Sequence, residues 1–334
     1  MEDVQFFNHI LDTFKINAKC IQFKQINTYN YYDILLLNKT KVKDITKYID
    51  EISLKLRVSS RPTVKVLHSE GVVRLEYTSN NNENINLFDL FADGDNPPNG
   101  NLKCLLGQSV NGNKIWMNLE DNPNLIISGT TGSGKSVLLH NIIANLLFFN
   151  KCKMYLIDPK NIEFSYYNNM NNIEVCNSYD EAIFIIDNLN ILMEKRFELL
   201  KNKLSFDALP PVVLIIDEFA DLILQDTTDL LYKKILKLSQ KCRAAKIHII
   251  ISTQRPSTNI INGAIKANFP ARISCKVASS IDSRIILDSL GAENLQGKGD
   301  SLLKDNLRSL ERFQVAFVDP LKTTDYFSNN SLVL

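Results

Sequence analysis

The sequence predicts an α/β protein with a mainly parallel sheet flanked by helices, preceded by a small α+β domain. Three observations support this prediction. From residue 105 onward, wholly apolar strands alternate with helices, which is typical of a parallel sheet covered on both faces. Before residue 96, a helical pattern is followed by two alternating β segments that form a hairpin. A length of 334 residues suits about two domains.

The N-terminal segment, residues 1–95, reads as the small domain. We expect a strand at 31–37, a helix at 43–56, and a hairpin formed by residues 63–67 and 71–77. The helix is predicted from apolar residues at helical spacing, and the hairpin from alternating β residues joined by a short turn sequence.

Turn-forming residues mark the boundary to the second domain. The stretch D-G-D-N-P-P-N-G at 93–100 predicts a linker, which we assign to residues 96–104. The second domain is expected at 105–320, and a short polar tail at 321–334. Within the second domain we expect strands at 114–117, 125–127, 154–157, 212–216, 247–252, 272–277, 301–303 and 313–318, and helices at 137–147, 180–203 and 229–241.

The composition is that of an ordinary globular protein. Hydrophobic residues make up 45% and charged residues 22% of the chain, and the net charge is +1. A nucleic-acid partner would therefore have to bind to local basic patches. The N-terminus lacks a signal-peptide pattern, and no apolar run approaches the ~18 residues that span a bilayer. We expect a cytoplasmic protein that reaches a membrane only through a partner.

The cysteines and histidines show no metal-binding pattern. The six cysteines form no C-x-x-C pair, which favours packed, reduced thiols in a reducing cytosol over a zinc site or a disulfide framework. The histidines, His9, His68, His140 and His248, are scattered without metal-ligand spacing. We interpret all of them as structural or surface residues.

The stretch from Asn124 to His140 carries the clearest chemical pattern. An apolar strand runs into G-T-T-G-S-G-K-S, which matches the phosphate-binding pattern G-x-x-x-x-G-K-[ST], and an apolar helix follows. Glycines let the backbone N–H groups surround phosphate oxygens, and the helix N-terminus adds its positive dipole end. We expect Lys135 to reach the β and γ phosphates of ATP and Ser136 to bind Mg²⁺. The predicted nucleotide-binding residues are Gly129, Thr130, Thr131, Gly132, Ser133, Gly134, Lys135 and Ser136.

A second apolar strand, residues 212–216, ends in the acidic pair Asp217-Glu218. Parallel sheets present ligands at the carboxyl ends of their strands. We expect Asp217 to hold Mg²⁺ through water and Glu218 to polarise the attacking water as a general base. The alternative is an ordinary helix N-cap with acidic residues in the first turn.

Three further residues have two interpretations each. Gln254 follows the strand predicted at 247–252, where it either senses the γ-phosphate or is simply a polar residue at a strand end. Arg243 is either a basic helix C-cap or an arginine finger acting on the ATP of a neighbouring subunit. Asp158 follows the strand at 154–157 and is either catalytic or part of the Asp-Pro turn that ends this strand.

Eight sequence blocks resemble the FtsK/SpoIIIE double-stranded DNA translocases, which are RecA-like P-loop ATPases. They are G-T-T-G-S-G-K-S (129–136), L-I-D-P-K (156–160), I-D-E-F-A-D-L (216–222), R-A-A (243–245), S-T-Q-R-P-S (252–257), I-K-A-N-F-P-A-R-I (265–273), I-D-S-R-I-I-L-D (281–288) and G-A-E-N-L-Q-G-K-G-D (291–300). Together these blocks cover the predicted motor domain, 105–320. The first hundred residues resemble the smaller domain that precedes the motor in this family.

The resemblance implies a hexameric ring around duplex DNA with ATP sites between subunits. Lys135, Ser136, Asp217 and Glu218 then keep the roles given above, and Arg243 matches the arginine that acts in trans. The resemblance also implies that basic loop residues grip the DNA backbone without reading sequence. These residues are Arg255, Lys266 and Arg284, which would otherwise be read as solvated surface charges.

The sequence departs from the family pattern in several places. Ser280 stands where the family often has a lysine, which predicts a weaker grip by the second DNA loop. The segment between the phosphate loop and the acidic pair is shorter than in the large cell-division members. We find no transmembrane anchor before the motor and no winged-helix module after it, and so expect movement along duplexes of any sequence.

These features predict an ATP-dependent double-stranded DNA translocase that uses Mg²⁺ and ATP. Two alternatives remain open, namely an ATPase that drives protein export, as in type VII secretion, and a motor for conjugative DNA transfer. A nucleotide-binding regulatory module without a motor cycle is disfavoured by the intact acidic pair, Asp217-Glu218. Double-stranded DNA, other copies of the chain, and a membrane-anchored or DNA-loading protein are the expected partners.

Overall fold

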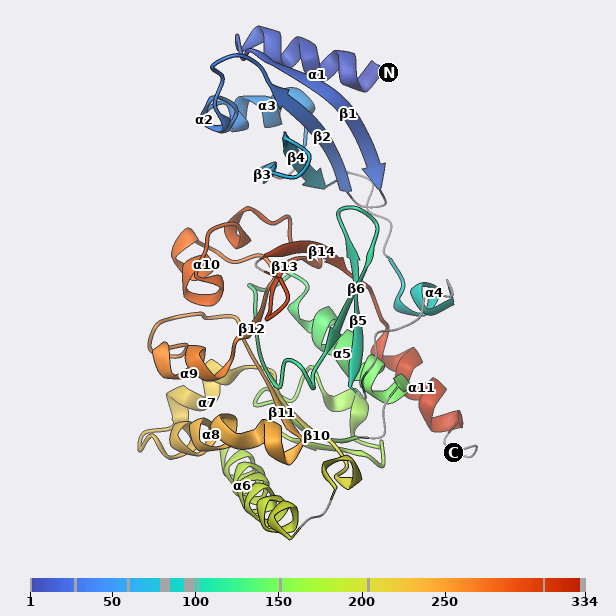
Figure 1. Ribbon diagram of the computed structural model, residues 1–334. Helices are drawn as coiled ribbons and strands as arrows, with labels where there is room; N and C mark the ends of the chain where they lie inside the picture. Colours follow the sequence, from blue (N-terminus) through green and yellow to red (C-terminus); the bar gives the residue numbers. More distant parts are fainter. Residues whose placement is uncertain are drawn as a thin grey trace. The chain divides into compact units, whose positions relative to one another are not determined.

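The computed structural model of the protein describes residues 2–26, 29–58, 61–78, 85–92, 100, 102–149, 152–202, 205–308 and 310–330 (Figure 1). The chain divides into two compact units. Unit 1 comprises Met1–Asn84 with the short segments Gln108–Asn113 and Asn294–Gln296, and unit 2 comprises the rest. Of the linker expected at 96–104, residues 96–99 and 101 lie outside the described residues.

Unit 1 is built on an antiparallel sheet of four strands in the order β1-β2-β4-β3. Its elements are α1 (Glu2–Thr13), β1 (Ala18–Ile26), β2 (Tyr29–Leu36), α2 (Val42–Thr46), α3 (Ile49–Leu56), β3 (Thr63–Leu67) and β4 (Val72–Thr78). The hairpin predicted at 63–67 and 71–77 is confirmed as β3 and β4. The single helix predicted at 43–56 is wrong, because a turn at Lys47 and Tyr48 separates α2 from α3.

Helix α1 and strand β1 have no counterpart among the predicted elements. One side of α1 buries Phe7, Ile10 and Leu11 in the core of unit 1. Phe7 stacks on Tyr32 of β2, with 4.2 Å between the ring centroids. Such a short helix draws most of its stability from tertiary packing, which sequence periodicity shows only weakly.

Unit 2 contains a sheet of ten described strands in the order β6-β5-β14-β13-β12-β7-β11-β10-β8-β9. The six strands from β12 to β9 are parallel, and β13 and β14 are antiparallel additions at the side of β12. The mainly parallel sheet is therefore confirmed. The strands are β5 (Lys103–Ser109), β6 (Lys114–Asn118), β7 (Asn124–Ser128), β8 (Lys153–Ile157), β9 (Ile173–Cys176), β10 (Val212–Ile216), β11 (Ile247–Thr253), β12 (Ala271–Ser274), β13 (Asp300–Lys304) and β14 (Glu311–Val315).

Most α-helices of unit 2 belong to one of two groups, whereas α10 packs against β12. One group packs around α6 and α8, and the other contains α5 and α11 (Figure 1). The α-helices are α4 (Leu87–Ala92), α5 (Lys135–Phe149), α6 (Tyr179–Lys201), α7 (Phe219–Gln225), α8 (Leu230–Lys241), α9 (Gly263–Asn268), α10 (Ser280–Leu287) and α11 (Pro320–Asn330). Short 3₁₀ helices are η1 (Ser165–Tyr167), η2 (Phe206–Ala208), η3 (Cys242–Ala245) and η4 (Ala292–Asn294).

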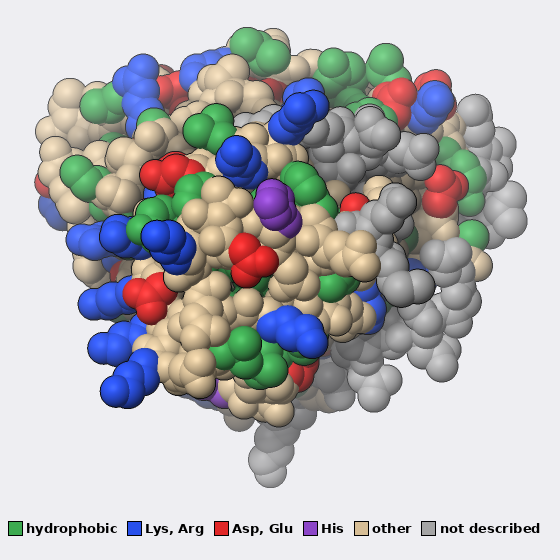
Figure 2. Space-filling view, turned by 90° about the horizontal axis from the view of Figure 1, so that it is seen from above, with side chains coloured by type: hydrophobic (Ala, Val, Ile, Leu, Met, Phe, Trp, Pro, Cys, Tyr) green, Lys and Arg blue, Asp and Glu red, His purple; other side chains and the backbone are tan. Residues whose placement is uncertain are grey.

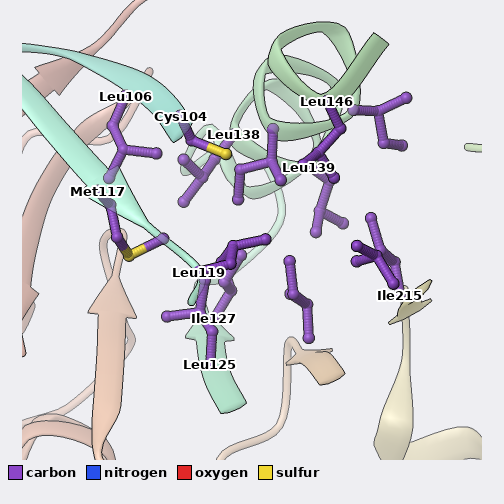
Figure 3. Packing of buried hydrophobic residues seen from close by; sticks show 14 of the residues in the cluster. Cys104, Leu106, Met117, Leu119, Leu125, Ile127, Leu138, Leu139, Leu146 and Ile215 are labelled. Carbon is purple, nitrogen blue, oxygen red and sulfur yellow. The ribbon is translucent and has the colours of Figure 1, made fainter. Parts of the chain in front are cut away.

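The central strands bury both of their faces. Figure 3 shows apolar side chains of β5, β6, β7 and β10 pointing toward Leu138, Leu139 and Leu146 of α5. On β10, Ile215 belongs to this cluster, whereas its neighbour Ile216 is equally buried. Since successive residues of a strand point to opposite faces, Ile216 fills the core on the other side. This double burial explains why the strands are apolar throughout.

Of the polar tail predicted at 321–334, residues 321–330 belong to helix α11 (Pro320–Asn330), and residues 331–334 lie outside the described residues. Thr323 of α11 is fully buried, and its backbone N–H and hydroxyl both donate to the carbonyl of Asp319. Phe327 packs against the main core of unit 2. The few apolar residues of this polar segment therefore suffice to dock a helix once α5 provides a surface.

The sequence predicts that the cysteines are reduced and packed and that none of the helices spans a membrane. All six cysteines are unpaired and buried, and burial raises the pKa of Cys20 and Cys275 to about 11, so these thiols stay protonated near neutral pH. Among the described residues, none of the helices is both long and apolar enough to cross a membrane.

The first N–H groups of α8 are capped by the side chain of Asp226, although Asp229 occupies the N-cap position. The Asp229 side chain makes no capping hydrogen bond. The Asp226 carboxylate instead accepts bonds from the N–H groups of Leu230 and Tyr232, both at 2.8 Å, and from the Tyr179 hydroxyl at 2.8 Å. Burial opposes the charge of Asp226, but these hydrogen bonds outweigh it and lower its pKa.

Asp226→Asn is expected to lower the free energy of unfolding by on the order of 1 kcal/mol at pH 7. Because the folded-state pKa is lowered, the charged carboxylate stabilises the protein above its unfolded pKa of about 3.9, and this contribution is lost as the pH falls further. Urea denaturation of the wild type and the variant at several pH values measures the difference. Asp229→Asn is the matched control, and an equal loss of stability in this control would contradict the assignment.

Candidate active site

The phosphate loop connects β7 to α5. Strand β7 ends at Ser128, residues 129–134 form the loop, and α5 begins at Lys135. Within the loop, Gly134 has a φ angle of 101°. A Cβ atom on Gly134 would lie 2.3 Å from the backbone nitrogen of Gly299. Glycine is therefore required here both by the backbone conformation and by a segment far away in the sequence.

Several N–H groups of the loop are available to a ligand. The amides of Thr131, Gly132, Gly134, Lys135 and Ser136 donate to no acceptor within the described part of the chain. The N-terminus of α5 adds the positive end of the helix dipole at the same place. A run of amides at a helix N-terminus binds phosphate oxygens. These residues therefore fit a nucleotide phosphate.

Lys135 lies where the ends of three neighbouring strands meet. Its Nζ is 2.7 Å from Oδ1 of Asp217, 2.9 Å from the carbonyl oxygen of Asp217 and 3.1 Å from the hydroxyl of Ser252. The side chains of Lys135 and Asp217 are only 3% and 4% exposed. Burial raises the pKa of Asp217, and the Lys135 ammonium acts in the opposite direction. The parallel order β7-β11-β10 thus brings the loop lysine to the first acid of the pair.

Glu218 is fixed against the end of β11. Its carboxylate accepts hydrogen bonds from the Thr253 hydroxyl at 2.7 Å and from the Gln254 N–H at 3.0 Å. The side-chain oxygen of Gln254 accepts a bond from the Thr131 hydroxyl in the phosphate loop at 3.1 Å. The structure therefore brings Glu218 and Gln254 to the same sheet edge as Lys135 and Asp217.

The helix-cap interpretation of the acidic pair does not describe these side chains. Glu218 stands at the N-cap position of α7, but its side chain makes no capping hydrogen bond. Asp217 pairs with Lys135, and Glu218 faces Thr253 and Gln254. Both carboxylates point toward the phosphate loop and β11, which favours the chemical interpretation.

Ser136 has a partner that sequence reasoning does not find. Its hydroxyl donates to Oε1 of Glu163 at 2.7 Å. The other carboxylate oxygen of Glu163 lies 3.6 Å from Nε2 of His140. The nearby His140 ring and the hydrogen bond from Ser136 outweigh burial and hold the pKa of Glu163 below its usual value. The only sequence signal for Glu163 is its place shortly after β8, at the same sheet edge.

Asp158 organises the loop that carries Glu163. Its fully buried carboxylate accepts bonds from the N–H groups of Lys160, Glu163 and Phe164, at 3.2, 2.8 and 3.0 Å. Of the two interpretations of Asp158, these contacts favour the turn. The hydroxyls of Ser252 and Thr253, which contact Lys135 and Glu218, are likewise missed by sequence reasoning, because polar ends of strands are common without function.

Arg243 lies away from this cluster within one chain. It belongs to η3, which follows α8, and it is exposed. No hydrogen bond or ion pair in the described residues links Arg243 to the phosphate loop or to a carboxylate. Its guanidinium is therefore available to a group outside the chain.

The basic residues assigned to DNA differ in their surroundings. Arg255 and Arg284 are exposed and have no carboxylate partner among the residues with described positions. Lys266 instead forms an ion pair with Asp288, whose Oδ1 lies 2.5 Å from Nζ. Arg272 also pairs with Asp288. The cations around Asp288 hold its pKa well below the usual range despite the opposing effect of burial.

Charges of both signs are mixed on the face of the molecule shown in Figure 2. On the face shown in Figure 2, Lys and Arg side chains gather along the left edge with Asp and Glu side chains among them. This mixture agrees with the net charge of +1. Contacts to phosphates therefore depend on particular side chains and not on a uniform positive field.

The fold and the site together define a class of protein. A phosphate loop between a strand and a helix, with an acidic pair and a polar strand end on the neighbouring parallel strands, is the arrangement of the RecA-like P-loop ATPases. Within this class, the chain belongs to the FtsK/SpoIIIE family. The sequence model of that family matches residues 95–207 and 202–258.

Curated relatives agree with this assignment. The DNA translocase FtsK of Borreliella burgdorferi is 35% identical over 322 residues, which cover 89% of this chain and 40% of the relative. The DNA translocase FtsK of Campylobacter jejuni is 36% identical over 286 residues, which cover 78% of this chain and 30% of the relative. The chain thus spans less than half the length of these relatives.

Solved structures confirm the fold. The pCW3 conjugation coupling protein TcpA, in a monomer form with ATPγS, matches with a TM-score of 0.66 and 21% identity, over 98% of this chain and 99% of that chain. The cytoplasmic domain of the type VII secretion ATPase EccC of Thermomonospora curvata matches with a TM-score of 0.63 and 19% identity, over 73% of this chain and 34% of that chain.

Proposed function

We propose that the protein is a motor that couples ATP hydrolysis to movement along double-stranded DNA. The observation that carries this proposal is the cluster at the sheet edge, where Lys135, Asp217 and Glu218 meet the phosphate loop. Membership in a family whose similar members are named DNA translocases adds the substrate. The test is ATPase activity of the purified protein with and without long duplex DNA.

The residues present suit Mg²⁺–ATP. Loop amides and Lys135 would hold the phosphates, and Ser136 and Asp217 would hold Mg²⁺, Asp217 through water. When bound, Mg²⁺ neutralises charge that develops on the phosphate oxygens. Glu218 would take a proton from the attacking water, because its carboxylate is fixed by hydrogen bonds at a place that faces the loop. Gln254, which is hydrogen-bonded to Thr131 and follows β11, would sense the γ-phosphate.

Self-assembly into a hexameric ring would complete the site. Arg243 is exposed and lacks a partner carboxylate in the described residues. In a ring, a neighbouring chain's Arg243 would stabilise charge on the transferred phosphoryl group, as arginine fingers do. A membrane-anchored or DNA-loading protein would direct the ring to its site of action on the DNA. ATP, DNA and six buried free thiols suit the cytoplasm as the location.

Protein export remains a second candidate, since the fold is also similar to a type VII secretion ATPase. The exposed Arg255 and Arg284 favour DNA, because unpaired surface guanidinium groups bind phosphates readily. The two candidates differ in the test above. Stimulation of ATP turnover by duplex DNA supports the DNA motor, whereas activity that is indifferent to DNA would contradict it.

Arg255→Ala and Arg284→Ala are each expected to weaken duplex binding for all sequences alike. Each change removes about one phosphate contact, so the slope of log K against log salt should flatten by about one unit. Lys266→Ala should have a smaller effect, since the ammonium of this lysine is already held by Asp288, a carboxylate that Arg272 and Lys304 share. Fluorescence anisotropy of labelled duplexes over a salt series measures the slope. Lys237→Ala, on the exposed side of α8 and paired with Glu194, is the matched control.

A further inference from the structure

Glu163 prepares Ser136 for a metal ion. A serine hydroxyl has one proton and two lone pairs. Ser136 donates its proton to Oε1 of Glu163 at 2.7 Å, and so its lone pairs stay free for another partner. A carboxylate that accepts from a metal-binding group also fixes the orientation of that group. This hydrogen bond therefore leaves the oxygen of Ser136 free to bind Mg²⁺.

Glu163 is held through both its backbone and its side chain. The backbone N–H groups of Glu163 and of the next residue, Phe164, both donate to the carboxylate of Asp158, at 2.8 and 3.0 Å, and Phe164 is fully buried in the core. The second carboxylate oxygen of Glu163 faces Nε2 of His140 at 3.6 Å. His140 lies one helical turn after Ser136 on α5, so both contacts of Glu163 come from one face of this helix.

His140 is itself oriented by a buried hydroxyl. Its Nδ1 lies 2.9 Å from the hydroxyl oxygen of Tyr167, which is fully buried in η1. Burial raises the pKa of Tyr167, so this hydroxyl keeps its proton. We assign a donor hydroxyl on Tyr167 and a proton on Nε2 of His140, because this tautomer lets the ring donate toward Glu163. A series of side-chain contacts thus runs from Tyr167 in the core through His140 and Glu163 to Ser136 in the phosphate loop.

We propose that Glu163 is a positioning residue that sets the affinity of the site for Mg²⁺ by orienting the Ser136 hydroxyl and by adding a negative charge next to it. The proposal rests on the proposed use of Mg²⁺–ATP. It assigns Glu163 no contact with the reacting atoms. A residue that acts in this way changes metal-dependent binding of nucleotide and leaves metal-independent binding unchanged.

The test compares binding of a fluorescent ATP analogue in Mg²⁺ and in EDTA. For Glu163→Ala, the gain in affinity on adding Mg²⁺ should fall by about 10-fold to 100-fold, the usual cost of losing a residue that supports a metal ligand. Affinity in EDTA should match the wild type, because the loop amides remain. Glu163→Gln keeps an acceptor without the charge and should lie between the two.

The controls separate the possible outcomes. Glu174→Gln, at an exposed position of the edge strand β9 and paired with Lys153 at 3.5 Å, should behave as the wild type. An equal loss of affinity in Mg²⁺ and in EDTA would show a structural role and overturn the proposal, as would an unchanged gain in both Glu163 variants. Absence of any Mg²⁺-dependent gain in the wild type would instead count against the proposed function.

Discussion

Glu218→Gln is expected to bind ATP normally and to hydrolyse it about 10² to 10⁴ times more slowly than the wild type. The neutral amide keeps the size of the side chain, and its oxygen still accepts a hydrogen bond from Thr253 or Gln254. It cannot accept the proton of the attacking water. Single-turnover hydrolysis of radiolabelled ATP, with nucleotide affinity measured in parallel, checks this expectation.

Lys135→Ala serves as the comparison for this variant. It removes the ammonium from the phosphate loop and leaves the buried Asp217 carboxylate without its cation. We expect it to lose nucleotide affinity and turnover together, whereas Glu218→Gln loses turnover alone. Hydrolysis by Glu218→Gln at the wild-type rate would show that another group acts as the base.

Arg243→Ala is expected to lower ATP turnover by roughly 10³-fold or more, if Arg243 acts as an arginine finger in trans. The exposed position of Arg243 predicts that the protein folds normally without it. The decisive measurement uses rings that mix Arg243→Ala chains with Lys135→Ala chains. Interfaces that combine an intact phosphate loop from one chain with an intact arginine from its neighbour should regain activity.

Lys241→Ala is the matched control, since Lys241 is the exposed basic residue that ends α8 just before η3. The helix-cap interpretation predicts similar small losses of stability for the two variants and no recovery in mixtures. Mixed rings of confirmed mass that stay inactive would therefore leave Arg243 as a helix cap.

Much of the site is encoded locally. The spacing of Gly129, Gly134, Lys135 and Ser136 fixes a phosphate loop wherever a strand leads into a helix. An apolar strand that ends in Asp217-Glu218 places two acids at a sheet edge, because wholly apolar strands belong to the middle of parallel sheets. Family resemblance and residue patterns agree on these positions, and the family is confirmed by the comparisons.

Other features depend on the order in which strands assemble. Lys135 meets Asp217 and Ser252 only because β7, β11 and β10 are neighbours in the sheet. Gly134 must be glycine partly because Gly299 approaches it. Neither contact can be read from spacing along the chain, since each joins segments that periodicity treats separately.

By itself, the sequence determined the class of fold, the phosphate loop and the acidic pair, because each is written in a short stretch of residues. Only the tertiary structure decided which other side chains contact the phosphate loop and the acidic pair. It joined Glu163 to Ser136 and paired Lys266 with Asp288 while leaving Arg255 exposed. It also brought the Asp226 carboxylate to the first N–H groups of α8. A hydrogen bond or an ion pair forms where two side chains meet in space, and that meeting is set by the packing of whole elements.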